Sequence, residues 1–204
     1  YHTYDRFLEL AHSNKEYTYE EAKELFFHSI SQFPQDFQDK AHEVLRDGFV
    51  DVMEKVGKRT GAYSSSVANL HPFILLNFDN TLDSVFTVAH EAGHSIHSMY
   101  ATQTQPTMLQ DYTIFVAEIA STFNEHTLLD YFLSLPDATK EEKIMVIQKA
   151  IDEIMSTFYR QTLFAEYEYL ANHEVAKGNP INHQVLSQIM IDLYKKYYGL
   201  DITK

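Results

Sequence analysis

The sequence predicts a mostly α-helical protein with one small β element. Most of its 204 residues lie in stretches that place apolar side chains every three or four positions, the spacing of an amphipathic helix. Six glycines and five prolines are few for this length, and several of them separate those stretches. Residues 57–80 differ, since a glycine- and serine-rich part leads into a short apolar run. This pattern predicts loops and two strands, and therefore a small β element near residues 61–78.

The first two helices have clear start or stop signals. Thr18 and Glu21 form a capping-box pattern, in which each side chain accepts a hydrogen bond from the other's backbone. The helix that they start is expected to end at Pro34. A second helix is expected from Gln35 to about Asp47.

Four further helical segments are expected after residue 80. They cover residues 81–100, 112–133, 140–175 and 182–198, within a residue or two. We find no internal repeat or linker-like stretch, so residues 1–204 are predicted to form a single helical region. Because the chain begins with Tyr1 rather than Met, we expect it to be a fragment of a longer polypeptide.

Composition excludes several classes of protein. A hydrophobic fraction of 45% is ordinary for a globular domain and excludes a disordered or fibrous chain. No apolar run approaches the ~18 residues that span a membrane, and no signal segment opens the chain. With 16 Lys and Arg against 29 Asp and Glu, the net charge of −13 repels nucleic acid and anionic membranes. Neither is expected as a partner.

The strongest chemical signal is the motif His90-Glu91-Ala92-Gly93-His94. The chain has no cysteine, so any metal must be held by His, Asp or Glu. Two histidines four residues apart on a helix can both reach one ion. Glu91, about 100° around the helix, would lie beside the ion, where it can take a proton from a bound water molecule. Gly93 costs a helix ~1 kcal/mol relative to Ala, which indicates that another group approaches its backbone closely.

A catalytic zinc takes three protein ligands and keeps one position open. His97 lies on the same face, but three histidines in two turns give poor tetrahedral geometry, so we expect it to face a ligand or the substrate instead. A carboxylate of a second helix is the better candidate. Glu118 is favoured because the apolar run 114–120 surrounds it and an unpaired buried carboxylate is costly. Glu125, seven residues later, would alternatively orient a ligand histidine. Asp111 is expected to be a solvated loop residue.

Four ordered blocks resemble the thimet oligopeptidase family of zinc peptidases, and within it the oligoendopeptidase F group. They are HEAGHSIHS at 90–98, FVAEIASTFNE at 115–125, GKRTGAYS at 57–64 and RQTLFAEYE at 160–168. The resemblance implies a helical zincin-type catalytic domain that encloses a deep channel. It also implies one zinc ion on His90, His94 and Glu118, with Glu91 as the general base.

The function implied by the resemblance is that of a zinc-dependent endopeptidase in the cytoplasm. Its substrates would be short peptides, attacked by water that the metal and Glu91 activate. Members of this family continue past the position of Lys204 into a Tyr- and His-rich segment that stabilises the tetrahedral intermediate. The alternative is therefore a metal-binding but catalytically incomplete fragment. A third possibility is a helical interaction module in which the motif is coincidental. The sequence predicts no particular oligomeric state.

Overall fold

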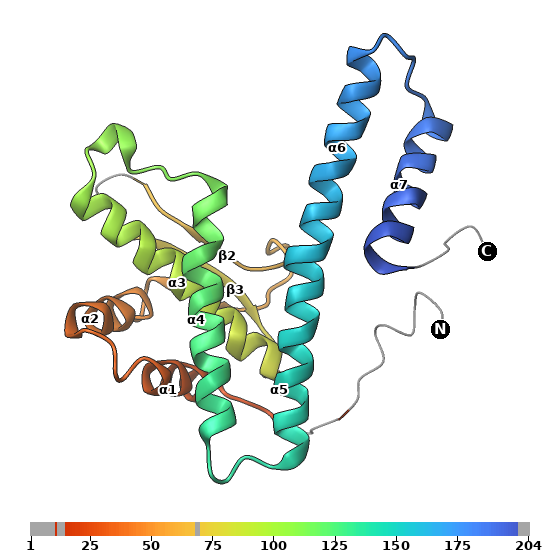
Figure 1. The fold of residues 1–204 in the computed structure, drawn as a ribbon. Helices are drawn as coiled ribbons and strands as arrows, with labels where there is room; N and C mark the ends of the chain where they lie inside the picture. The colour runs from red at the N-terminus through yellow and green to blue at the C-terminus, as the bar shows by residue number, and fades with distance from the viewer. Residues whose placement is uncertain (1–10, 12–14, 68–69, 200–204) are drawn as a thin grey trace. The chain divides into compact units, whose positions relative to one another are not determined.

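The structure is a computed structural model that describes residue 11 and residues 15–67 and 70–199 (Figure 1). The chain divides into two compact units, Ser13–Thr139 and Tyr1–His12 with Lys140–Lys204. The first unit contains α1 (Tyr19–Ser29), α2 (Gln35–Val44), β1 (Val50–Met53), β2 (Tyr63–Ser65), β3 (Phe73–Phe78), α3 (Leu82–Thr104), the 3₁₀ turn η2 (Thr107–Leu109) and α4 (Ile114–Ser134). The second contains α5 (Lys140–Glu153), the π-helical turn η3 (Ile154–Tyr159), α6 (Arg160–Ala176) and α7 (His183–Tyr198).

The predicted class, mostly α with a small β element, is confirmed. That residues 1–204 form one catalytic region stays a prediction. Within the part of the chain that the structure describes, no helix combines the length and the hydropathy needed to cross a membrane.

The first helix begins as predicted and ends earlier. The Thr18 side chain accepts a hydrogen bond from the Glu21 backbone N–H, and the Glu21 carboxylate accepts one from the Thr18 backbone N–H at 2.7 Å. The predicted end at Pro34 was wrong, because the chain leaves the helix after Ser29 through a tight turn closed by the N–H of Ile30. Similarly, α2 ends at Val44, three residues before the predicted end.

A three-stranded sheet packs against the core of the first unit with one of its faces. The two predicted strands, β2 and β3, pair in antiparallel fashion, and β3 turns Ile74, Leu76 and Phe78 toward the core. The sequence analysis missed β1, a four-residue strand that pairs in parallel with β3. The strand order β1-β3-β2 leaves β2 at an edge of the sheet.

Helix α3 is the central element of the first unit. Helices α1, α2 and α4 pack against it, as do strands β2 and β3 (Figure 1). Thr81 begins the helix by accepting a hydrogen bond from the Ser84 backbone N–H. Apolar residues on several sides of α3 are fully buried, among them Val85, Phe86 and Ala92. This packing fixes the direction in which the motif side chains of α3 point.

The described part of the second unit consists of helices and their connections. The single helix predicted for residues 140–175 consists of α5 and α6 joined by η3, where the helix widens into a π turn. The Glu166 carboxylate of α6 accepts hydrogen bonds from Lys196 Nζ and the Tyr197 hydroxyl of α7, at 2.7 and 2.6 Å.

The close approach predicted at Gly93 is confirmed. A Cβ atom added there would lie 2.8 Å from the Ala120 carbonyl oxygen, and 2.9 Å from both Ser121 Cα and Asn124 Nδ2. Two of these atoms belong to the backbone of α4 and cannot rotate away. Asn124, itself buried, donates a hydrogen bond to the Ala89 carbonyl oxygen one turn earlier in α3. The glycine therefore lets α4 lie directly on α3.

We expect Gly93→Ala to destabilise the fold although alanine is the better helix former. Overpacking costs typically 1–3 kcal/mol, against a propensity gain of about 1 kcal/mol. The variant should also bind metal more weakly, because α4 carries Glu118. Chemical denaturation of the metal-free protein measures the first effect. Gln103→Ala, at an exposed position of α3, is the control and should change little. Equal stability of both variants would contradict tight α3–α4 packing.

Candidate metal centre

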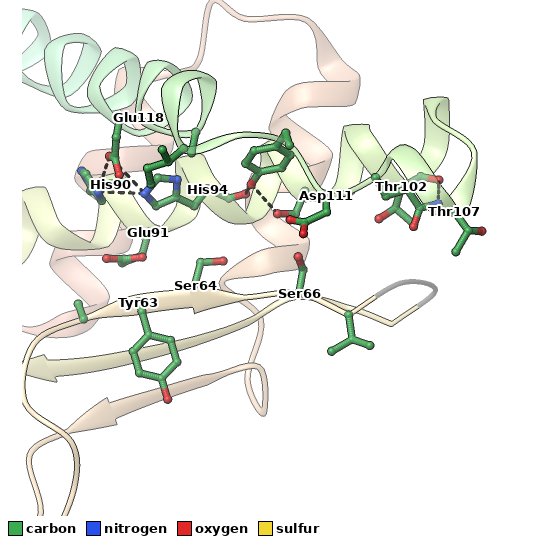
Figure 2. A pocket seen from close by; sticks show the side chains of 17 residues that line it. Tyr63, Ser64, Ser66, His90, Glu91, His94, Thr102, Thr107, Asp111 and Glu118 are labelled. Carbon is green, nitrogen blue, oxygen red and sulfur yellow. Dashed lines mark hydrogen bonds and ion pairs between the residues drawn. The ribbon is translucent and has the colours of Figure 1, made fainter. Parts of the chain in front are cut away.

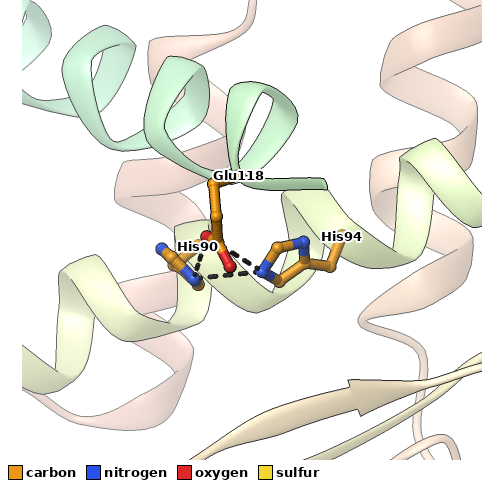
Figure 3. A group of neighbouring side chains, drawn as sticks. All are labelled: His90, His94 and Glu118. Atoms are coloured by element: carbon orange, nitrogen blue, oxygen red, sulfur yellow. Dashed lines mark hydrogen bonds and ion pairs between the residues drawn. The ribbon is translucent and has the colours of Figure 1, made fainter. Parts of the chain in front are cut away.

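Three side chains from α3 and α4 converge on one point (Figure 3). The Nε2 atoms of His90 and His94 lie 3.1 Å apart, and Glu118 Oε2 lies 3.5 Å from each of them. The two histidines are one turn apart on α3, and Glu118 comes from the first half of α4. The structure thus brings together the three residues named from the sequence.

The outer nitrogens of both rings have acceptors. His90 Nδ1 lies 3.1 Å from Glu125 Oε2, and the ring of His94 donates to the Ala117 backbone carbonyl. These partners fix the tautomer, placing the ring proton away from the point of convergence. Each Nε2 then turns a lone pair toward the other and toward the Glu118 carboxylate. In this tautomer all three atoms are acceptors, and one shared cation would satisfy them together.

The spacing and the donor types fit zinc. Ligand atoms at the usual zinc distances of 2.0–2.2 Å lie about 3.3–3.5 Å from one another around a tetrahedral ion, close to the 3.1 and 3.5 Å observed. Two imidazole nitrogens and one carboxylate are the donor set of a catalytic zinc site with an open position. Magnesium and calcium prefer oxygen-only sites.

The pKa values of the two histidines are shifted by burial and by the charged groups around them. Burial lowers the pKa of His90, but the carboxylates of Glu125, Glu91 and Glu118 outweigh it, so the pKa is raised overall. Burial and the neighbouring charge of His90 lower the pKa of His94. The ring of His90 is hydrogen-bonded to the Glu125 carboxylate, and the lowered pKa of His94 keeps its ring neutral. Both states make an imidazole a good metal ligand.

Glu91 lies beside this group and outside it. Its side chain is 5% exposed, and burial raises its pKa to about 7 against the opposing effects of His90 and of the Ser64 backbone N–H, which donates to the carboxylate. Glu91 Oε2 has no hydrogen-bond partner among the described residues. This carboxylate therefore has one oxygen held by β2 and one available for a proton.

The other candidates from the sequence take different positions. Glu125 contacts His90, which is the orienting role left open for it. His97 stacks on Tyr112, with ring centroids 3.8 Å apart, and lines an apolar groove between α3 and α4 rather than the metal centre. Asp111 is exposed as expected, but it lies on the wall of the same pocket as the histidines.

A pocket of about 640 Å³ contains the centre (Figure 2). Helix α3 and the start of α4 form one side, and β2 forms the other. The hydroxyls of Ser64 and Ser95, 2.8 Å apart, tie β2 to α3. Tyr63 points away from the histidines in this view, whereas Ser64 and Ser66 point toward α3.

Sequence reasoning missed the role of Tyr112. Its hydroxyl lies 2.8 Å from Ser98 Oγ and donates to the His94 carbonyl oxygen at 3.3 Å. Burial raises its pKa, and the charge of Asp111 adds to this effect. Nothing local in the sequence indicates these contacts, because they depend on how the loop before α4 folds back on α3.

The class of protein that this fold and this site define is the helical metallopeptidases of the His-Glu-x-x-His type. Comparison with known proteins agrees. The family model of peptidase family M3 matches residues 5–204, and the chain belongs to that family.

Individual relatives point to the same group. Oligopeptidase PepF of Bacillus subtilis is 37% identical over 199 residues, which cover 97% of this chain and 30% of that protein. An oligoendopeptidase F homolog of Borreliella burgdorferi is 41% identical over 157 residues, 76% of this chain and 26% of that one. A solved structure of a putative peptidase from Chlamydophila abortus superposes with a TM-score of 0.82 at 41% identity, covering 100% of this chain and 34% of that chain. The chain therefore spans between about a quarter and about a third of the length of these relatives.

Proposed function

We propose that this chain carries the catalytic centre of a zinc-dependent endopeptidase that hydrolyses short peptides in the cytoplasm. The observation that supports it most is the convergence of His90 Nε2, His94 Nε2 and Glu118 Oε2 on one point. A buried carboxylate with a free oxygen stands next to them. The oligopeptidase and oligoendopeptidase names of the relatives favour peptides as the substrate class.

Each residue has a task in this proposal. His90, His94 and Glu118 hold the ion, and Glu125 keeps the His90 ring in place. A bound zinc ion supplies a Lewis acid that polarises the scissile carbonyl and makes the attacking water more acidic. Glu91 takes a proton from that water and gives it to the leaving amine. Its pKa near 7 suits both directions of transfer. An extended peptide would lie along the edge strand β2.

A second candidate is a metal-binding chain that is catalytically incomplete, and the pocket lining favours it for the 204 residues alone. Acyl transfer needs donors aimed at the developing oxyanion, each worth about 10²–10³-fold in rate. The 17 residues that line the described pocket include neither Lys nor Arg. The Tyr112 hydroxyl already donates to the His94 carbonyl, and Tyr63 points away.

We therefore expect the 204-residue chain to bind zinc with little turnover of its own. Metal analysis of the purified chain, together with cleavage of a quenched fluorescent peptide, tests both parts. A longer polypeptide that contains the chain is the comparison, and its activity should disappear with a chelator and return with zinc. Equal turnover by the two polypeptides would mean that a donor lies within the 204 residues. A zinc-free chain, or chelator-resistant cleavage, would contradict the proposed function.

A further inference from the structure

The pocket extends beyond the metal centre into a second section with polar walls. Figure 2 shows it running along β2 from the histidines toward the C-terminal end of α3. The second section is lined by Ser66, Thr102, Thr107 and Asp111. Asp111 is the one charged residue there, since the other Asp, Glu and His residues that line the described pocket, His90, Glu91, His94 and Glu118, lie at or beside the metal centre.

The loop before α4 holds Asp111 in place. On one side of it, Gln110 Nε2 donates to the carbonyl oxygens of Thr102 and Gln105 at 3.3 and 3.2 Å. On the other, Tyr112 donates to the His94 carbonyl. Both neighbours are thus anchored to the C-terminal half of α3 or its end. The carboxylate between them is exposed and forms no ion pair with a described residue. The Asp111 carboxylate, held on the pocket wall without a cationic partner among the described residues, is therefore available to a cationic group of a ligand.

The position of this section relative to the metal centre sets which part of a substrate reaches it. Thr102 follows His94 by eight residues on α3, which at 1.5 Å per residue is about 12 Å. An extended peptide advances roughly 3.3 Å per residue. A substrate whose scissile bond lies at the histidines therefore reaches Thr102, at the far end of the section, with its third or fourth residue. Figure 2 places Asp111 between His94 and Thr102, so the substrate passes Asp111 with its second or third residue.

We infer that Asp111 forms a subsite that selects a lysine or arginine side chain two or three residues from the scissile bond. Its carboxylate pairs with the cationic end, and the Thr and Ser hydroxyls around it accept the remaining donors. Because Asp111 is exposed, such a pair is worth about 0.2–1 kcal/mol, or roughly a 1.4- to 5-fold preference, and salt weakens it. This inference rests on the proposed function, which fixes where the substrate backbone runs.

The test uses peptides in which a phosphinate replaces the central peptide bond. The phosphinate mimics the tetrahedral transition state and binds the zinc, so that the register of the peptide is known. A single Lys is moved through the four positions on each side, against a matched series with Gln. Fluorescence anisotropy with the zinc-loaded 204-residue chain should give a 1.4- to 5-fold lower Kd for Lys than for Gln, at the second or third position of one side alone.

Variants assign the preference to one residue. Asp111→Asn should abolish it, and Asp111→Lys should reverse it in favour of Glu at the same position. Asp130→Asn, at an exposed site of α4, removes the same charge and should leave the preference intact. An equal gain from Lys at all positions, or a preference that survives Asp111→Asn, would overturn the subsite. If none of the phosphinate peptides bound, the proposed function itself would fail, and the subsite with it.

Discussion

Replacing Glu91 with Gln should lower kcat/KM for peptide hydrolysis by about 10²–10⁴-fold, the usual contribution of a general base. The amide keeps the shape of the side chain but cannot accept a proton. The zinc content should remain at one ion per chain, because Glu91 lies beside the three converging atoms and is not one of them. The measurement is steady-state cleavage by an active polypeptide that contains this chain, paired with elemental analysis of the same sample.

Two further variants make this result specific. Glu91→Asp retains a carboxylate that is one methylene too short, so its activity should lie between those of the wild type and of Glu91→Gln. Glu54→Gln, at an exposed position, should behave as wild type. Loss of zinc from Glu91→Gln would show that Glu91 is a ligand and that the base must be sought elsewhere.

The second large effect separates two carboxylates of α4. Glu118→Ala should weaken zinc binding most, because it removes one of the three converging atoms and leaves two histidines alone. Glu125→Ala removes a hydrogen-bond partner of His90 and should cost about 10–100-fold in affinity, as is typical of residues that orient a ligand. Titration against a competing chelator gives both affinities.

Asp130→Ala serves as the control for this series, since Asp130 is exposed on the same helix. Its zinc affinity should equal that of the wild type. If Glu125→Ala lost more affinity than Glu118→Ala, the ligand and the orienting residue would have to be exchanged.

Much of the fold could be predicted because its signals are local. The capping box at Thr18, the apolar run of β3 and the apolar spacing of α3 each depend on a few neighbouring residues. β1 escaped prediction because it is four residues long and its partner lies more than 20 residues further along the chain. The early end of α1 was not predicted because apolar residues continue at helical spacing as far as Phe33, although the chain turns after Ser29.

The candidate site divides in the same way. His90, Glu91 and His94 share one helix, so their spacing alone predicts their arrangement. Glu118 was singled out by a charge within an apolar run, and Gly93 by its cost to a helix, both of which are sequence signals of tertiary contact. Tyr112 and the pocket position of Asp111 carry no such signal. Both positions depend on the loop between α3 and α4 folding back onto α3. That arrangement is set by tertiary contacts and not by the local sequence.

X-ray absorption at the zinc edge, on the purified 204-residue chain after dialysis, tests the central claim most directly. We expect one tightly held zinc per chain with two imidazole nitrogens and carboxylate or water oxygens at about 2.0–2.2 Å. The imidazole signal should fall by half in His94→Ala. A chain that retains no zinc, or a zinc whose spectrum lacks imidazole scattering, would contradict it.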